Sequence, residues 1–153
     1  MKHIRTAAII QHKDKILLHS AQNENYWTLP GGAVEEESTK EGLIREMMEE
    51  LGEAVEIKEL KIIAENQFFY RGKKIDSVEF YYQVELLPKS LLIEKESFVR
   101  TEAFGQFGDQ PYELMFKWFN LNQLDNLILL PAFLATELQQ MEPNQMKHIE
   151  QLT

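Results

Sequence analysis

The segment from Ser38 to Gly52 places the strongest local constraint on the fold. Ser38 is a good N-cap residue, and Glu41, three residues later, completes a capping box that satisfies free backbone N–H groups. Four apolar residues have the i, i+3, i+4 and i+7 spacing of a helical stripe: Ile44, Met47, Met48 and Leu51. Gly52 suits the left-handed residue that ends many helices. The pattern predicts a helix over residues 39–51.

The same helix should carry a second, acidic face. Glu46, Glu49 and Glu50 have the i, i+3, i+4 spacing that brings side chains to one side of a helix. These carboxylates repel one another and lie near the helix C-terminus, where the macrodipole disfavours anions. A hard divalent cation with oxygen ligands would offset both effects. A merely solvated acidic face is the alternative that this spacing leaves open.

The residues around this helix favour the metal interpretation. Between Gly31 and Glu53 the chain has eight glutamates against one lysine and one arginine. The segment opens with a Gly-Gly turn that leads towards the helix N-terminus, where backbone groups can approach a ligand closely. Arg45 and Glu49 have the i, i+4 spacing of a helical ion pair, which could hold one carboxylate in place.

Composition limits the classes of protein to which the chain can belong. A length of 153 residues predicts one domain spanning residues 1–153, with a polar, loose C-terminal tail over about 141–153. The net charge of −9 disfavours binding to nucleic acid or to an anionic membrane surface. The absence of cysteine excludes thiol catalysis and fits a reducing compartment, so we expect a cytoplasmic protein.

The remaining elements predict an α+β fold, because strands and helices are mixed without regular βαβ alternation. The β-rich segments are 3–11, 16–19, 26–29, 55–64, 67–70, 77–87 and 116–119. A second helix is expected near residues 131–140. Residues 100–111, which contain Gly105 and Gly108, are expected to form a loop.

A specific family resemblance begins at Gly31. Residues 31–37 read GGAVEEE, and after seven further residues the chain continues with REMMEELG over residues 45–52. This arrangement resembles the box of the Nudix hydrolase family (MutT-like), here Gly31 to Glu53, and every fixed letter of that pattern matches. The departures are Glu53, where the family has an aliphatic residue, and Glu36, where many members have glycine. The resemblance implies an α/β/α sandwich with a mixed sheet between helices.

The resemblance also implies roles for individual residues. Glu46, Glu49 and Glu50, with the carbonyl of Gly31, would bind Mg²⁺, or alternatively Mn²⁺. Glu37 and Arg45 would orient these ligands, which gives Arg45 a place in the catalytic set with Glu49 and Glu50. Either Glu49 or Glu50 is the expected general base. Family members also recruit a base from elsewhere, and the candidates for that role are Glu79, Glu102, Asp109 and Glu113, each of which is also readily explained as a surface acid.

Substrate recognition is less strongly indicated by the sequence. Phe68 and Tyr70 follow the box at about the distance at which family members carry specificity residues, and Arg71 could contact a phosphate. The spacing of Tyr70 is similar to that of diadenosine-polyphosphate hydrolases. Alternating aromatic residues in a strand are also typical of a core, and basic residues at a hairpin tip are often only solvent-exposed.

The resulting expectation is an Mg²⁺-dependent pyrophosphohydrolase. It would cleave a nucleoside diphosphate linked to another group (a nucleoside triphosphate, a dinucleoside polyphosphate or a nucleotide sugar) by water attack on phosphorus. The expected partner is therefore a nucleotide-derived small molecule, with no nucleic acid and no membrane. The alternative is a regulatory Nudix module that senses a nucleotide without cleaving it. A homodimer is compatible with the resemblance, and the sequence does not decide it.

Overall fold

The computed structural model describes residues 1–22, 24–102 and 112–153. Its helices are α1 (Thr39–Leu51) and α2 (Leu134–Gln139), with short 3-10 helices η1 (Leu92–Glu94) and η3 (Leu121–Asn126). Its strands are β1 (His3–His12), β2 (Lys15–Ala21), β3 (Gly31–Ala33), β4 (Val55–Tyr70), β5 (Lys73–Leu86), β6 (Ser97–Glu102), β7 (Tyr112–Asn120) and β8 (Lys147–Gln151).

The strands form one mixed sheet in the order β6-β7-β2-β1-β5-β4-β8, and β3 pairs with β1. The pairs β1/β5 and β4/β8 are parallel, and the other pairs are antiparallel. β4 and β5 make a long hairpin whose register runs from the Val55–Leu86 pair to the Tyr70–Lys73 pair. β1 and β2 pair only beside their turn, at Gln11–Ile16 and His12–Lys15.

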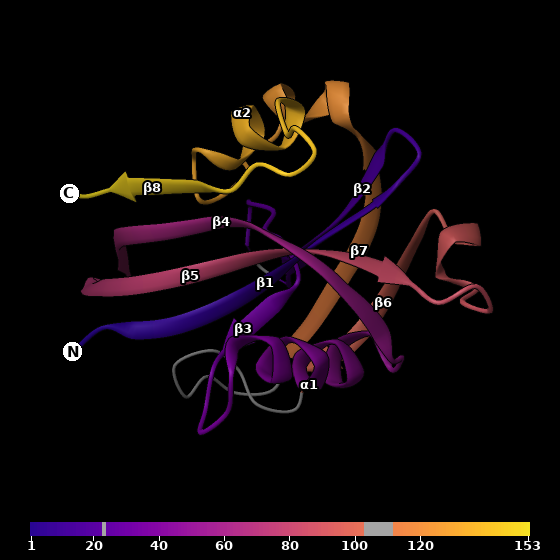
Figure 1. Cartoon of the computed structure of the whole chain (residues 1–153), viewed down its shortest axis with the longest axis horizontal. Helices are drawn as coiled ribbons and strands as arrows, with labels where there is room; N and C mark the ends of the chain where they lie inside the picture. The colour runs from indigo at the N-terminus through magenta and orange to yellow at the C-terminus, as the bar shows by residue number, and fades with distance from the viewer. Residues whose placement is uncertain (23, 103–111) are drawn as a thin grey trace.

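The two α-helices lie on opposite sides of the sheet (Figure 1). Leu43, Met47 and Leu51 of α1 are buried in one apolar cluster. Leu134 and Leu138 of α2 are buried in a second cluster with residues of β1, β2 and β4. Because each face of the sheet is covered by a helix and its own core, the predicted α/β/α sandwich is confirmed.

Several predicted segments differ in extent from the structure. Residues 55–64 and 67–70 are parts of the single strand β4, since their intervening residues also pair with β5. The expected strand at 26–29 is reduced to single bridges, between His19 and Thr28 and between Trp27 and Leu129. Of the expected loop at 100–111, residues 100–102 belong to β6, and the rest lies outside the described residues.

The prediction of a loose tail after residue 141 is wrong for residues 147–151. These residues form β8, which adds to the sheet edge in parallel with β4, so that Ala64 pairs with Ile149. Ile149 packs against the cluster beneath α2. An edge strand such as β8 buries little more than one apolar side chain, so the residues around Ile149 are polar. This polarity is why composition alone indicated a loose tail.

Helix α1 has the predicted bounds and caps. The Ser38 hydroxyl accepts a hydrogen bond from the Glu41 backbone N–H at 3.1 Å, and the Glu41 carboxylate accepts one from the Ser38 N–H at 3.2 Å. Gly52 ends the helix in the left-handed conformation, with φ of 72°. Within the described residues, no helix is long and apolar enough to cross a membrane.

The predicted apolar stripe of α1 is only half correct. Met47 and Leu51 are buried, whereas Ile44 and Met48 are 44% and 49% exposed. Leu43 takes the place of Ile44, and Glu46 and Glu50 complete the buried face. The helix is turned towards the sheet so that two carboxylates face inward. Hydrophobic spacing cannot predict that orientation.

The neighbouring residues Leu43 and Ile44 provide a test of this orientation. Leu43 is 0% exposed, so Leu43→Ala should lower the free energy of unfolding by about 2–5 kcal/mol. Ile44→Ala, on the exposed side, should lower it by no more than about 0.5–1 kcal/mol. Urea unfolding followed by circular dichroism measures both. Equal losses in the two variants would contradict the orientation.

Candidate active site

A cavity of about 820 Å³ is lined by residues of α1 and of the sheet. Its walls come from β1, β2, β3, β4 and β5, from α1, and from the segment that leads into α2. Three carboxylates of α1, those of Glu46, Glu49 and Glu50, line it together with Gly31. The structure therefore brings together all of the residues predicted as metal ligands.

The two glycines of β3 allow this close packing. Gly31 and Gly32 pair with Ala7 and Thr6 of β1. A Cβ atom on Gly31 would clash with the backbone oxygen of Thr6, and one on Gly32 would lie 2.5 Å from the carboxyl carbon of Glu46. Any larger residue at position 32 would thus occupy the space in which the Glu46 carboxylate lies.

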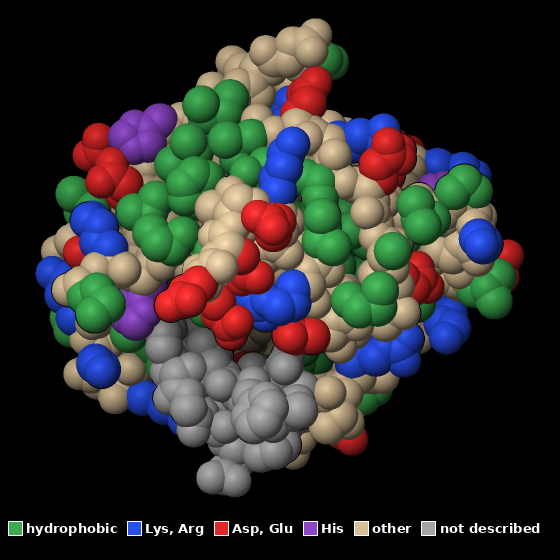
Figure 2. Space-filling model, turned by 60° about the horizontal axis from the view of Figure 1, so that its bottom comes forward, with side chains coloured by type: hydrophobic (Ala, Val, Ile, Leu, Met, Phe, Trp, Pro, Cys, Tyr) green, Lys and Arg blue, Asp and Glu red, His purple; other side chains and the backbone are tan. Residues whose placement is uncertain are grey.

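The three carboxylates differ in burial. Glu46 is 9% exposed and Glu50 is 3% exposed, whereas the Glu49 side chain is 48% exposed. Buried carboxylates are costly unless they are hydrogen-bonded or near positive charge. Figure 2, in which the α1 end of the molecule comes forward, shows several acidic side chains gathered close to basic ones on this face.

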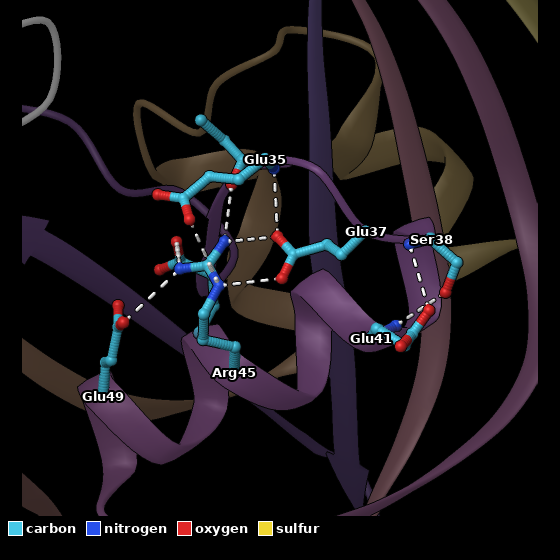
Figure 3. Close-up of polar contacts among 8 residues, drawn as sticks. Glu35, Glu37, Ser38, Glu41, Arg45 and Glu49 are labelled. Atoms are coloured by element: carbon cyan, nitrogen blue, oxygen red, sulfur yellow. Dashed lines mark hydrogen bonds and ion pairs between the residues drawn. The ribbon is translucent and has the colours of Figure 1, made fainter.

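Arg45 is the cation at the centre of this acidic group (Figure 3). Its Nε and Nη2 donate to the two carboxylate oxygens of Glu37 at 3.0 and 2.7 Å, which is a bidentate pair. Nη1 donates to Glu46 at 3.1 Å and to Glu49 at 3.4 Å. Nη2 also donates to the carbonyl of Ala33 at 3.1 Å, so one guanidinium connects β3, the following loop and α1. The expected i, i+4 pair with Glu49 is confirmed.

The protonation of this pair is strongly biased towards the charged forms. The hydrogen bonds from Arg45, with a smaller contribution from the backbone N–H of Glu35, lower the pKa of Glu37 from 4.5 to about 2. Hydrogen bonding to Glu37 raises the pKa of Arg45 well above its ordinary value. Both groups are therefore charged throughout the neutral range.

His19 of β2 also reaches the acidic group, which the sequence analysis did not predict. Its Nε2 lies 3.2 Å from the carbonyl of Leu29, and its Nδ1 lies 3.8 Å from Glu50 Oε1. Since a carbonyl only accepts, Nε2 carries the proton. Burial lowers the pKa of His19 to about 4, so the ring is neutral at pH 7 and supplies no positive charge to Glu50. The sequence signal that could have pointed to His19 is the presence of a histidine within an otherwise apolar strand.

A second polar group lies on the sheet side of the cavity, which we call the cavity floor: Asn66, Ser77, Glu79 and Tyr81. The Glu79 carboxylate accepts hydrogen bonds from Ser77 Oγ at 2.7 Å, Tyr81 OH at 2.6 Å and Asn66 Nδ2 at 3.2 Å. Burial and the neighbouring Glu79 raise the pKa of Tyr81 well above its ordinary value, so its hydroxyl stays a donor. Asn66 and Ser77 were missed because single polar residues in a strand carry no spacing signal.

The other residues predicted from the sequence do not all line the cavity. Phe68 and Tyr70 line the cavity, whereas Arg71 does not and lies with its guanidinium carbon 5.1 Å from the centre of the Tyr70 ring. Glu79 is only 5% exposed, which corrects its interpretation as a surface acid. Glu113 is exposed and is not part of the cavity wall. The Glu102 side chain and Asp109 lie outside the described part of the chain.

The fold and this site together have the arrangement of a known family. The model of the NUDIX domain family matches residues 1–141. The chain belongs to the NUDIX domain family. This match confirms the resemblance drawn from the sequence, and with it the prediction of a hydrolase that acts on pyrophosphate bonds.

Solved structures with the same fold have low sequence identity to the chain. A UDP-X diphosphatase is 22% identical with a TM-score of 0.61, covering 97% of this chain and 67% of that one. An ADP-ribose pyrophosphatase from Streptococcus suis is 21% identical with a TM-score of 0.58, covering 98% and 99%. An Ap4A hydrolase from C. elegans is 20% identical with a TM-score of 0.55, covering 91% and 95%. No curated protein matches the chain.

The lowered pKa of Glu37 predicts a specific pH dependence. Ionised Glu37 should stabilise the wild type fully above pH 4.5, and this contribution should be lost as the pH falls towards 2. The difference in urea midpoint between the wild type and Glu37→Gln should therefore be constant near neutral pH and shrink between pH 4.5 and 2. Glu36→Gln, which changes an exposed neighbouring carboxylate, is the control and should show no comparable difference. A Glu37→Gln difference that did not vary with pH would contradict the assignment.

Proposed function

We propose that the cavity catalyses Mg²⁺-dependent hydrolysis of a phosphoanhydride bond in a nucleotide derivative. The observation that supports this proposal most is the convergence of Glu46, Glu49 and Glu50 on one cavity wall, beside a guanidinium that is itself fixed by Glu37. Stability alone does not favour this arrangement, because like charges gather at the helix end where the dipole opposes them.

The donor set fits a hard divalent cation. Carboxylate and carbonyl oxygens are the ligands that Mg²⁺ and Mn²⁺ take, and Glu46, Glu49, Glu50 and the Gly31 carbonyl supply them. Two features of the structure agree with this assignment. The nearly fully buried Glu50 lines the cavity, and Gly32 leaves room for the Glu46 carboxylate where a side chain would fill it. When bound, the cation would neutralise phosphate charge and lower the pKa of a coordinated water.

The residues of the chain have distinct tasks in this proposal. Arg45 holds Glu46 and Glu49 in place, and Glu37 holds Arg45. A water oxygen attacks phosphorus, the P–O bond to the leaving phosphate breaks, and the water proton passes to a carboxylate. Glu49 and Glu50 are both candidates for this general base: Glu49 is more exposed, whereas Glu50 is buried and its carboxylate faces His19.

The proposed substrate is a nucleoside diphosphate linked to a further group. A cavity of about 820 Å³ is within the usual range for a small-molecule site, and Phe68 and Tyr70 add aromatic surface to its wall. The similar structures named above include enzymes for UDP-X, ADP-ribose and Ap4A, which share a nucleoside joined through at least two phosphates. We further propose a cytoplasmic location; a homodimer stays a prediction.

Glu50→Gln tests the catalytic assignment. It removes one buried carboxylate charge from the metal site, so hydrolysis should fall by at least about a hundredfold, with the circular dichroism spectrum unchanged. The measurement is phosphate and pyrophosphate release from a panel of nucleoside triphosphates, dinucleoside polyphosphates and nucleotide sugars, with Mg²⁺ and then with EDTA. Glu36→Gln makes the same charge change at an exposed position of the box and should keep wild-type activity.

Each outcome of that panel has a clear meaning. Cleavage that depends on Mg²⁺ and is lost in Glu50→Gln supports the hydrolase and identifies the substrate class. Near-wild-type turnover in Glu50→Gln would show that the role given to Glu50 is wrong. Tight nucleotide binding without any product would favour a sensing module over an enzyme.

A further inference from the structure

The cavity floor lies on different elements from the acidic helix. Asn66 of β4 is paired directly with Ser77 of β5, and Glu79 and Tyr81 follow Ser77 at alternate positions of the same strand. Alternate residues of a strand point to one face, so these side chains form a continuous polar row. Asn66, Glu79 and Tyr81 all line the cavity.

Glu79 fixes the orientation of the Asn66 amide. An ionised carboxylate only accepts hydrogen bonds, and Glu79 Oε2 receives one from Asn66 Nδ2 at 3.2 Å. If the amide were turned round, its carbonyl oxygen would face the carboxylate and both groups would be acceptors. Ser77 and Tyr81 donate to the same carboxylate and hold it in place. The Asn66 oxygen is therefore directed away from Glu79.

This oxygen is unsatisfied. Asn66 is only 3% exposed, and its Oδ1 has no hydrogen-bond partner among the described residues. Leaving a buried acceptor unpaired is unfavourable unless a ligand supplies a donor. The amide nitrogen makes a side-chain hydrogen bond to Glu79 alone within the same residues, so its second N–H is also available. Beyond its bond to Glu79, the Asn66 amide thus has one unpaired acceptor and one adjacent N–H.

We propose that Asn66 recognises a nucleobase that carries an amino group beside an unprotonated ring nitrogen, as adenine and cytosine do. The amino group donates to Oδ1 and the ring nitrogen accepts from Nδ2, which is the pairing that asparagine makes with adenine elsewhere. Phe68 and Leu134, which also line the cavity, provide apolar surface for the base. The inference rests on the proposed function only in that the substrate is a nucleotide.

Nucleoside monophosphates test recognition separately from hydrolysis, because they contain no phosphoanhydride bond. AMP and IMP differ at the base by an amino group in place of an oxo group, and CMP and UMP differ in the same way. Isothermal titration of the intact protein in Mg²⁺ should show about tenfold or tighter binding of the amino-bearing member of at least one pair. The pair that shows the difference separates adenine from cytosine.

Two variants separate recognition from a purely structural role of the floor. Glu79→Gln introduces a side-chain amide that can donate as well as accept, so the Asn66 amide is free to turn and the preference should fall to less than about threefold. Ser77→Ala also removes one hydrogen bond to Glu79 but leaves the Asn66 orientation fixed, so the preference should be kept. If the cavity floor served only to join β4 to β5, both variants would change the free energy of unfolding without changing the preference for the amino-bearing nucleotide.

Comparing AMP with IMP and CMP with UMP in the wild type tests the proposal even if a variant fails to fold. Equal binding within both pairs, tighter binding of the oxo members, or no saturable binding of any of the four would overturn the proposal. A clear amino preference in a protein that cleaves none of the nucleotides on the panel would keep this recognition and reject the proposed hydrolysis. Hydrolysis without any preference would do the reverse.

Discussion

The bidentate ion pair between Arg45 and Glu37 is the interaction on which the site depends. It joins the loop after β3 to α1, and the same guanidinium contacts Glu46, Glu49 and the Ala33 carbonyl. Without a fixed cation among them, neighbouring carboxylates would separate or become protonated. The partly enclosed position of the pair, with Arg45 27% and Glu37 17% exposed, limits the screening that weakens surface ion pairs. Arg45 is thus the residue of opposite charge that holds these carboxylates in place.

Two groups of buried polar side chains lie at the cavity, and they are stabilised differently. Around α1, carboxylates are balanced by Arg45 and face a cavity that a cation can enter. On the cavity floor, Glu79 accepts hydrogen bonds from three neutral donors. Apolar cores lie on both faces of the sheet beside these groups. A network of this kind is costly when incomplete, so the unsatisfied Oδ1 of Asn66 is informative.

Sequence patterns predicted the parts of the structure that depend on local chemistry. The caps of α1, its length and the approach of Arg45 to Glu49 follow from residues a few positions apart, and the family box drew attention to the acidic face of this helix. What could not be predicted depends on contacts between distant segments. The orientation of α1, which buries Glu50 instead of Met48, is set by packing on the sheet. His19 reaches Glu50, and residues 147–151 pair with β4, only because the sheet brings them together.

The separation of the cavity floor from α1 has a consequence for how the substrate specificity of such a protein can evolve. The carboxylates belong to one helix and one loop, whereas Asn66 and Glu79 belong to a hairpin with its own hydrogen bonds. Substitutions in the hairpin can therefore alter which molecule is accepted without disturbing the groups that we propose to act on phosphate. Divergence of specificity needs few compensating changes in this architecture, and laboratory evolution towards a new substrate should begin in β4 and β5.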